Sequence, residues 1–154
     1  FLFKTILDPL VVLFSVPFAV VGVILGHILF DYNLQFLSVI GLLALIGIVV
    51  NDSLILIDFL KKIREKTSNR IEAVIEACRV RARPIILTSV TTFLGISPLI
   101  FFATGQTKFL SPMAVSLGFG LIFATLLILI VLPCFYLIMD DFKIYLLSLR
   151  SKLK

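Results

Sequence analysis

An aspartate inside a long apolar run is the residue of this sequence best suited to chemistry. Residues 41–59 read GLLALIGIVVNDSLILIDF, so Asn51, Asp52 and Ser53 stand side by side in a segment long enough to cross a bilayer. A charged carboxyl group is costly in hydrocarbon and usually faces a bundle interior or a wet pathway. We predict that Asp52 binds and releases a proton or cation. The alternative is a protonated acid that only joins two helices.

Hydroxyl and guanidinium groups at a similar depth are the candidate partners of Asp52. Counted from the basic segment that follows, Thr91 lies about as deep as Asp52, and Thr88 lies about one turn shallower. Each threonine either relays a proton or bonds back to a carbonyl of its own helix. Arg81 is either a positive gate near the mouth or an interfacial anchor. The possible relay neighbours are Ser53, Thr91 and Thr92.

The other polar residues favour structural roles. Asp58 lies four residues before Lys62, where an i,i+4 ion pair is available. Asp58 also lies about 120° around the helix from Asp52, so the two acids are not expected to form a catalytic dyad. His27 has no acidic or histidine partner in the sequence and is expected to be a satisfied interfacial histidine.

No enzyme, cofactor or metal centre is expected. The chain has no glycine loop that would cradle a phosphate. Cys78 and Cys134 are the only cysteines, and their spacing predicts unpaired thiols and no zinc site.

The composition indicates an all-α membrane protein. Hydrophobic residues make up 60% of the 154 residues, and the mean hydropathy is +1.19. We expect four antiparallel transmembrane helices at residues 10–30, 34–60, 84–103 and 112–139. The predicted parts are the end of a preceding helix and a turn (1–9), a hairpin (10–60), a basic cytoplasmic connector (61–83), a second hairpin (84–139) and a basic cytoplasmic tail (140–154). We take the chain to be part of a longer polypeptide, since it opens on Phe1.

Small residues and a proline mark how the first and last spans pack. Pro17 is expected to kink the first span. Gly22 and Gly26 form a G-x-x-x-G ridge that allows another helix to approach, and Gly120 and Ala124 serve the same purpose in the last span. Asp31, Tyr32 and Asn33 are expected to form a polar turn.

The connector is expected to hold a short amphipathic helix on the membrane surface. Asn69 and Glu72 resemble a capping box, and an apolar face follows at Ile71, Val74, Ile75 and Cys78. Pro84 is expected to begin the third span, because the first turn of a helix tolerates a missing N–H group.

The positive charges predict the orientation. Residues 61–83 hold eight basic and three acidic side chains, and all of the 14 Lys and Arg residues except Lys108 lie on the connector side of the spans. By the positive-inside rule, the connector and both ends are cytoplasmic. Because the basic residues flank apolar spans, the partner is the lipid bilayer, with no nucleic acid.

The chain resembles the last membrane helices of resistance-nodulation-division (RND) efflux transporters of the hydrophobe/amphiphile efflux type. The resemblance extends from FKTILDPLVVLFSVPFAVVGVILGH to the final span, and RARPIILTS at residues 81–89 is its most specific part. It implies helices nine to twelve of a proton-driven antiporter, preceded by the end of helix eight. It also implies a homotrimer in the bacterial inner membrane, with a periplasmic adaptor and an outer-membrane channel as possible partners.

The resemblance also implies a proton site to which this chain contributes. In the family, two aspartates on the fourth helix act with a lysine on the tenth helix and a threonine and an arginine on the eleventh. The last three positions fall on Asn51, Thr88 and Arg81. This chain departs from the pattern, since asparagine replaces the lysine and Asp52 stands where asparagine is usual.

The departure implies altered coupling. Compared with the family pattern, the cluster has one more acid and one ammonium group fewer, which changes its charge. The proton stoichiometry is therefore expected to differ, and sodium is the alternative coupling ion. Two other functions stay open. One is protein export or lipid transport within the same superfamily, and the other is a structural membrane module in which Asp52 only packs.

Overall fold

The computed structural model of the chain describes residues 13–67 and 69–152, and the side chains of residues 13–67, 69–139 and 141. The described residues form four α-helices and one 3-10 helix, joined by turns and loops, and contain no strand. Their bounds are Val16–Leu29 (α2), Phe36–Arg64 (α3), Arg70–Phe101 (α4), Gly105–Leu110 (η1) and Ser111–Lys152 (α5).

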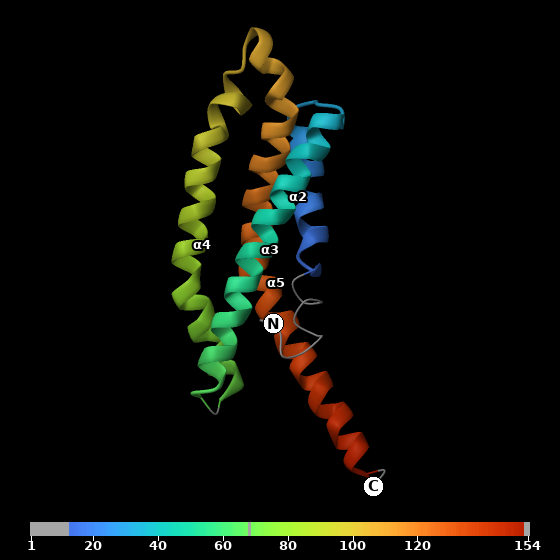
Figure 1. Cartoon of the computed structure of the whole chain (residues 1–154), viewed down its shortest axis with the longest axis vertical. Helices are drawn as coiled ribbons and strands as arrows, with labels where there is room; N and C mark the ends of the chain where they lie inside the picture. Colours follow the sequence, from blue (N-terminus) through green and yellow to red (C-terminus); the bar gives the residue numbers. More distant parts are fainter. Residues whose placement is uncertain (1–12, 68, 153–154) are drawn as a thin grey trace.

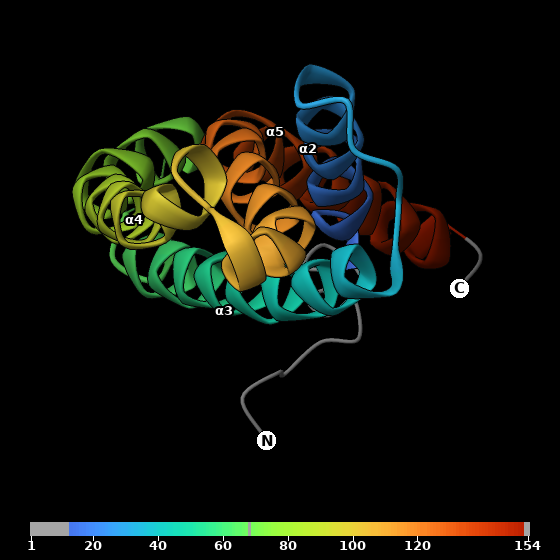
Figure 2. The ribbon, with the colours of Figure 1, turned by 90° about the horizontal axis from the view of Figure 1, so that it is seen from above.

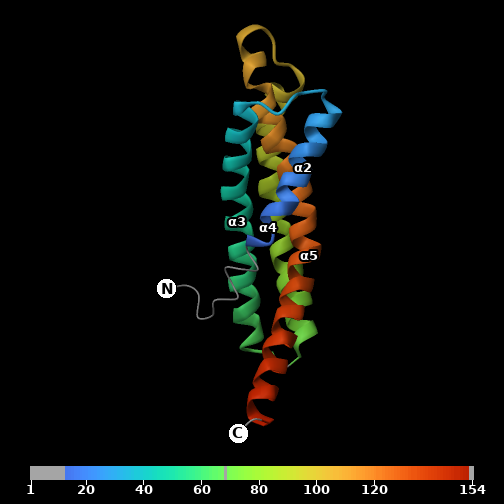
Figure 3. The ribbon, with the colours of Figure 1, turned by 90° about the vertical axis from the view of Figure 1, so that its right-hand side faces the viewer.

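The long helices α3, α4 and α5 form an antiparallel bundle (Figures 1 and 3). Helix α5 packs against α2, α3 and α4, and is the element that all the others share. Seen from above, α5 lies between α4 and α2, and α3 runs along one side of them (Figure 2). The C-terminal part of α5 extends beyond the rest of the bundle (Figure 3).

The predicted all-α membrane fold is confirmed. Among the described residues, α3, α4 and the segment from Gly105 to Met139 are long and apolar enough to cross a membrane. Helix α2 has 14 residues, fewer than the roughly 20 that a bilayer requires. The predicted first span begins at residues outside the described part, so three spans are established there and the fourth stays a prediction.

The predicted first span is interrupted near Pro17. A turn at Phe14 and Ser15 precedes α2, and Pro17 falls in the first turn of that helix. A first-turn N–H group has no partner within its helix, so proline is tolerated there. Whether the span is kinked at this point depends on residues 10–12, which lie outside the described part.

The predicted close approach at Gly22 and Gly26 is confirmed. A Cβ atom added at Gly22 would lie 2.6 Å from Cβ of Phe123, and one added at Gly26 would lie 2.6 Å from Cβ of Phe119. Only glycine leaves room for α5 at these two positions. The polar turn at residues 31–33 is also present, and Asp31 adopts a left-handed φ of 55° there.

Helix α4 corrects the prediction for the connector. Asn69 caps its start as expected, because its Oδ1 accepts a hydrogen bond from Ile71 N at 3.2 Å. The helix then continues without a break through Pro84 to Phe101. The predicted helix start at Pro84 is wrong, and no separate surface helix exists between residues 70 and 83.

Packing explains why the connector segment joins the bundle. Ala77 and Val74 are buried together with Leu60 of α3, with Tyr136 of α5 beside them. Ile71 and Ile75 of the predicted apolar face stay 62% and 61% exposed. This burial favours a continuous helix, although Pro84 cannot donate a hydrogen bond in the middle of it.

The backbone of α5 also continues beyond the predicted end of its span. The predicted span ends at Met139, where Asp140 and Asp141 follow, and the apolar segment also ends there, but the helix runs on to Lys152. Nη1 of Arg70 donates a hydrogen bond to Oδ1 of Asp141 at 2.7 Å, which joins the start of α4 to this part of α5. The sequence also predicts an apolar face on the tail, at Phe142, Tyr145, Leu149 and Leu153, but these side chains lie outside the described ones.

Candidate functional site

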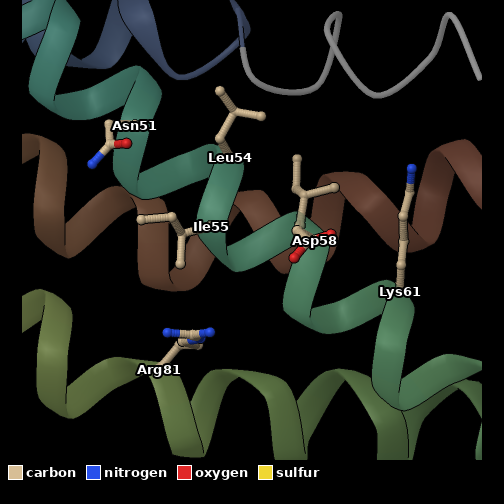
Figure 4. A pocket seen from close by; sticks show the side chains of 7 residues that line it. Asn51, Leu54, Ile55, Asp58, Lys61 and Arg81 are labelled. Atoms are coloured by element: carbon tan, nitrogen blue, oxygen red, sulfur yellow. The ribbon is translucent and has the colours of Figure 1, made fainter. Parts of the chain in front are cut away.

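A pocket of about 370 Å³ lies between α3 and α4, in the half of the bundle nearest the connector (Figure 4). Its polar lining combines an amide, an acid and two cations with three aliphatic side chains. The lining residues are Asn51, Leu54, Ile55, Ile57, Asp58, Lys61 and Arg81. Two of the predicted relay residues, Asn51 and Arg81, therefore meet at one cavity although they come from different helices.

The α3 side of the pocket follows from helical spacing. Asn51 and Asp58 are seven residues apart, which places them within about 20° of each other around the helix. Leu54 and Ile55 fill the turn between them. The sequence-based prediction placed Asp58 only relative to Asp52, so it missed that Asp58 and Asn51 share one face of the helix.

Asp58 also makes the ion pair that the sequence predicts. Its Oδ2 lies 2.7 Å from Nζ of Lys62, and the side chains of Lys62 and Asp58 are 67% and 49% exposed. Exposed pairs of this kind contribute little to stability. Asp58 thus takes part in an exposed ion pair and also lines the pocket.

Arg81 is the residue that α4 contributes to the pocket. It reaches from α4 toward α3 (Figure 4), and its Cζ lies 4.5 Å from the centroid of the Phe59 ring. This cation–π contact fixes the plane of the guanidinium group. Nε of Arg81 is buried, and no described residue accepts a hydrogen bond from it. Arg81 therefore brings a positive charge and a buried N–H donor to the pocket.

The three polar residues of the central cluster face different surroundings. Asn51 is exposed at the pocket, Asp52 is half-buried and does not line it, and Ser53 is fully buried. Ser53 donates a hydrogen bond to Oγ of Ser15 at 3.1 Å and so joins α3 to the segment before α2. No described residue hydrogen-bonds the Asp52 carboxylate.

The threonines of α4 bond back to their own helix. Thr88 Oγ1 donates to the carbonyl oxygens of Pro84 at 3.1 Å and Ile85 at 2.9 Å. Thr91 Oγ1 donates to the carbonyl oxygens of Leu87 and Thr88. Both side chains are exposed in this chain, and Thr92 is half-buried. The structure does not bring these three hydroxyls to the pocket.

Two buried polar contacts were not predicted. Ser89 and Thr125 place their hydroxyl oxygens 2.6 Å apart and join α4 to α5. His27 is 3% exposed, and its Nε2 lies 2.7 Å from Oγ of Ser38. His27 is satisfied, as predicted, but it is buried between helices. A polar residue on the apolar face of a span is the signal that would have found Ser89.

Within the described residues, no group of three or more His, Cys, Asp or Glu side chains is arranged to hold a metal ion. The chemistry that the pocket offers is that of one carboxylate, one amide and two cations in a partly open cavity.

Comparison with known proteins gives consistent matches. A sequence model of the AcrB/AcrD/AcrF family matches residues 1–140. The multidrug resistance protein MdtC of Pantoea ananatis (strain AJ13355) is 33% identical over 143 residues, or 92% of this chain. The chain spans only 14% of the length of that relative.

Solved structures with a similar fold include a heavy metal efflux pump in two crystal forms. Form I matches with a TM-score of 0.78 and form II with a TM-score of 0.75, both at 30% identity. Each match covers 86% of this chain and 13% of the pump.

Proposed function

Because the chain belongs to the AcrB/AcrD/AcrF family of RND efflux transporters, we propose that it forms part of the membrane domain of a proton-driven exporter of amphiphilic compounds. The family consists of transporters and not enzymes, and the three long apolar helices are those of a multi-pass membrane protein. The proposed role of this chain is to supply part of the intramembrane proton relay.

The pocket between α3 and α4 is the observation that supports this role. It brings Asn51 and Arg81 to one cavity. By the sequence resemblance, these two positions correspond to the lysine and the arginine of the family's proton site. In the proposal, Asn51, Asp52, Thr88 and Arg81 form the relay, and Ser53, Thr91 and Thr92 are its neighbours. The coupling ion is the proton, with sodium as the alternative.

The exposed side chains of the relay support a partner within the same polypeptide. Asn51, Thr88 and Thr91 are exposed here, together with apolar residues such as Leu87 and Leu94, which are 65% and 61% exposed. In the proposal, another membrane helix of the transporter covers this face and brings the remaining acids. The complete transporter is proposed to be a homotrimer in the bacterial inner membrane, where a periplasmic adaptor and an outer-membrane channel complete the export route.

The first test measures efflux by the complete transporter in cells that lack their main efflux pumps. Wild type is expected to lower the accumulation of ethidium, and an uncoupler is expected to abolish this effect. Asp52→Asn and Arg81→Ala are each expected to slow efflux by about tenfold or more, since positioned proton-transfer groups have effects of at least this order.

Arg79→Ala is the matched control, because Arg79 is an exposed arginine two residues away on the same helix. It is expected to transport like wild type. Normal efflux by both Asp52→Asn and Arg81→Ala, at matched membrane expression, would contradict the relay.

A heavy metal ion is the second candidate substrate, since a pump for heavy metals is among the solved structures of similar fold. The same cells are therefore challenged with silver and zinc salts. Protection against the metals without any effect on ethidium would replace the amphiphile with a metal ion. If the transporter protects the cells neither against the metals nor against ethidium, both proposed substrates are wrong, and protein export or lipid transport is favoured.

A further inference from the structure

We propose that Asp58 is the carboxylate through which the relay pocket exchanges protons with water on the connector side of the membrane; this inference rests on the proposed function. Sequence reasoning assigned Asp58 only a surface ion pair. The structure places it in the same pocket as Asn51 and Arg81 and leaves about half of its side chain exposed. A group that hands protons between a cavity and bulk water requires both kinds of access.

The position of Asp58 along α3 fits an exit from the pocket. It lies two helical turns from Asn51 toward the connector and about 9 Å before the end of the helix at Arg64. The side chain of Asp58 is 49% exposed in this chain, and the residue also lines the cavity. Asp52 does not line this cavity, so it lacks the same route to water.

The charged groups that face Asp58 come from two helices. Lys62 pairs with it at 2.7 Å, Lys61 lines the pocket on the same helix, and Arg81 lines it from α4. These are the charged residues that the structure describes around the pocket. Asp58 is therefore the one carboxylate that lines the pocket among these cations.

The proposed step involves only O–H bonds. In the complete transporter, an acid that the covering membrane helix brings to this face releases its proton, which reaches Asp58 through water in the pocket. At about 370 Å³, the pocket has room for several water molecules. The carboxylate becomes a neutral carboxyl group and its ion pair with Lys62 is lost. Asp58 then releases the proton to bulk water as hydronium, and the ion pair forms again. Arg81 repels excess protons from the pocket and so favours release.

The test uses the complete transporter, reconstituted in proteoliposomes with a pH-sensitive dye inside. The driven substrate is ethidium or a silver salt, whichever wild type exports. Asp58→Asn is expected to slow substrate-dependent proton flux by about tenfold or more and to remove its dependence on the pH of the connector side. Asp58→Glu is expected to restore most of both, because it returns a carboxyl group to the same site.

Lys62→Ala separates proton transfer from a structural ion pair. It removes the pair but leaves the carboxylate, so its proton flux is expected to stay within about twofold of wild type. Flux lost equally in Lys62→Ala and Asp58→Asn, without rescue by glutamate, would show a structural pair and overturn the inference. Wild-type flux in Asp58→Asn would also overturn it.

Different experimental results would contradict this inference and the proposed function. Normal proton flux in Asp58→Asn, together with slow efflux in Arg81→Ala and Asp52→Asn, would support the relay and remove only Asp58 from it. Normal transport in all three variants would overturn both.

Discussion

The hydroxyl group of Ser38 shows how a buried polar residue is satisfied at an interhelical contact. Nδ1 of His27 lies 2.9 Å from the carbonyl oxygen of Val23, which can only accept, so Nδ1 carries the proton. In the neutral ring Nε2 then accepts, and the Ser38 hydroxyl donates to it at 2.7 Å. The Ser38 oxygen accepts in turn from Gln35 N at 3.2 Å. Every polar atom of this contact between α2 and α3 has a partner.

Ser38→Ala is expected to lower the free energy of unfolding by about 1 kcal/mol, since it leaves Nε2 of buried His27 without its donor. Detergent-induced unfolding of the purified transporter measures the change. Ser97→Ala is the control, because Ser97 Oγ bonds only the Leu94 carbonyl of its own helix, at 2.8 Å. The control is expected to change stability by less than about 0.5 kcal/mol. Equal losses of stability in the two variants would show that the hydrogen bond between His27 and Ser38 contributes no more than one within a single helix.

Close packing on α5 organises the helices as elements. Gly22 and Gly26 of α2 face Phe123 and Phe119 of α5 with no room for a methyl group. Gly41 of α3 likewise approaches α5, since a Cβ atom there would lie 2.5 Å from the carbonyl oxygen of Met113. Without a hydrophobic driving force between helices in lipid, this backbone approach is a main source of association.

Gly22→Ala is expected to destabilise the bundle by about 1–3 kcal/mol, because the added methyl group forces α2 and α5 apart. Gly47→Ala is the matched control in a transmembrane helix, since no atom of the described part of the chain lies within 4 Å of a Cβ atom placed there. It is expected to be neutral or stabilising by up to about 1 kcal/mol, because alanine favours the helix. The same unfolding assay compares them, and a loss of stability in Gly47→Ala alone would refute the packing argument.

At the scale of the whole molecule, the two ends of the bundle carry different charge. The α3–α4 hairpin at Lys66 and Thr67 lies at the end rich in lysine and arginine, and η1 with Lys108 lies at the opposite end (Figure 1). Helices α3, α4 and α5 alternate in direction between these ends. From the positive-inside rule, we propose that the α3–α4 hairpin lies in the cytoplasm.

Single cysteines test this orientation in a variant of the complete transporter that lacks native cysteines. Lys66→Cys is expected to react with a membrane-impermeant maleimide only after the cells are opened, and Lys108→Cys is expected to react in intact spheroplasts. Both side chains are exposed, so access to the reagent and not burial decides the outcome. Labelling in the reverse order would invert the proposed topology.

Features that depend on residues close together in the chain could be predicted from the sequence. The apolar runs predicted the membrane helices, Asn69 predicted the start of α4, and the spacing of Asp58 and Lys62 predicted their ion pair. The glycines of the first span predicted a close helix contact, though not which helix they meet. The family resemblance was also readable, since it rests on residue order alone.

Tertiary structure decided which face of each helix is buried and which side chains share a cavity. Pro84 is a helix-start signal locally, but the burial of Val74 and Ala77 against Leu60 keeps α4 continuous through it. Arg81 meets Phe59, Asn51 and Asp58 only because α3 and α4 pack at one particular rotation. Hydropathy and short-range spacing determine that a segment is a helix in the membrane. The rotation of that helix depends on side chains far away in the sequence, and so the composition of the candidate site does too.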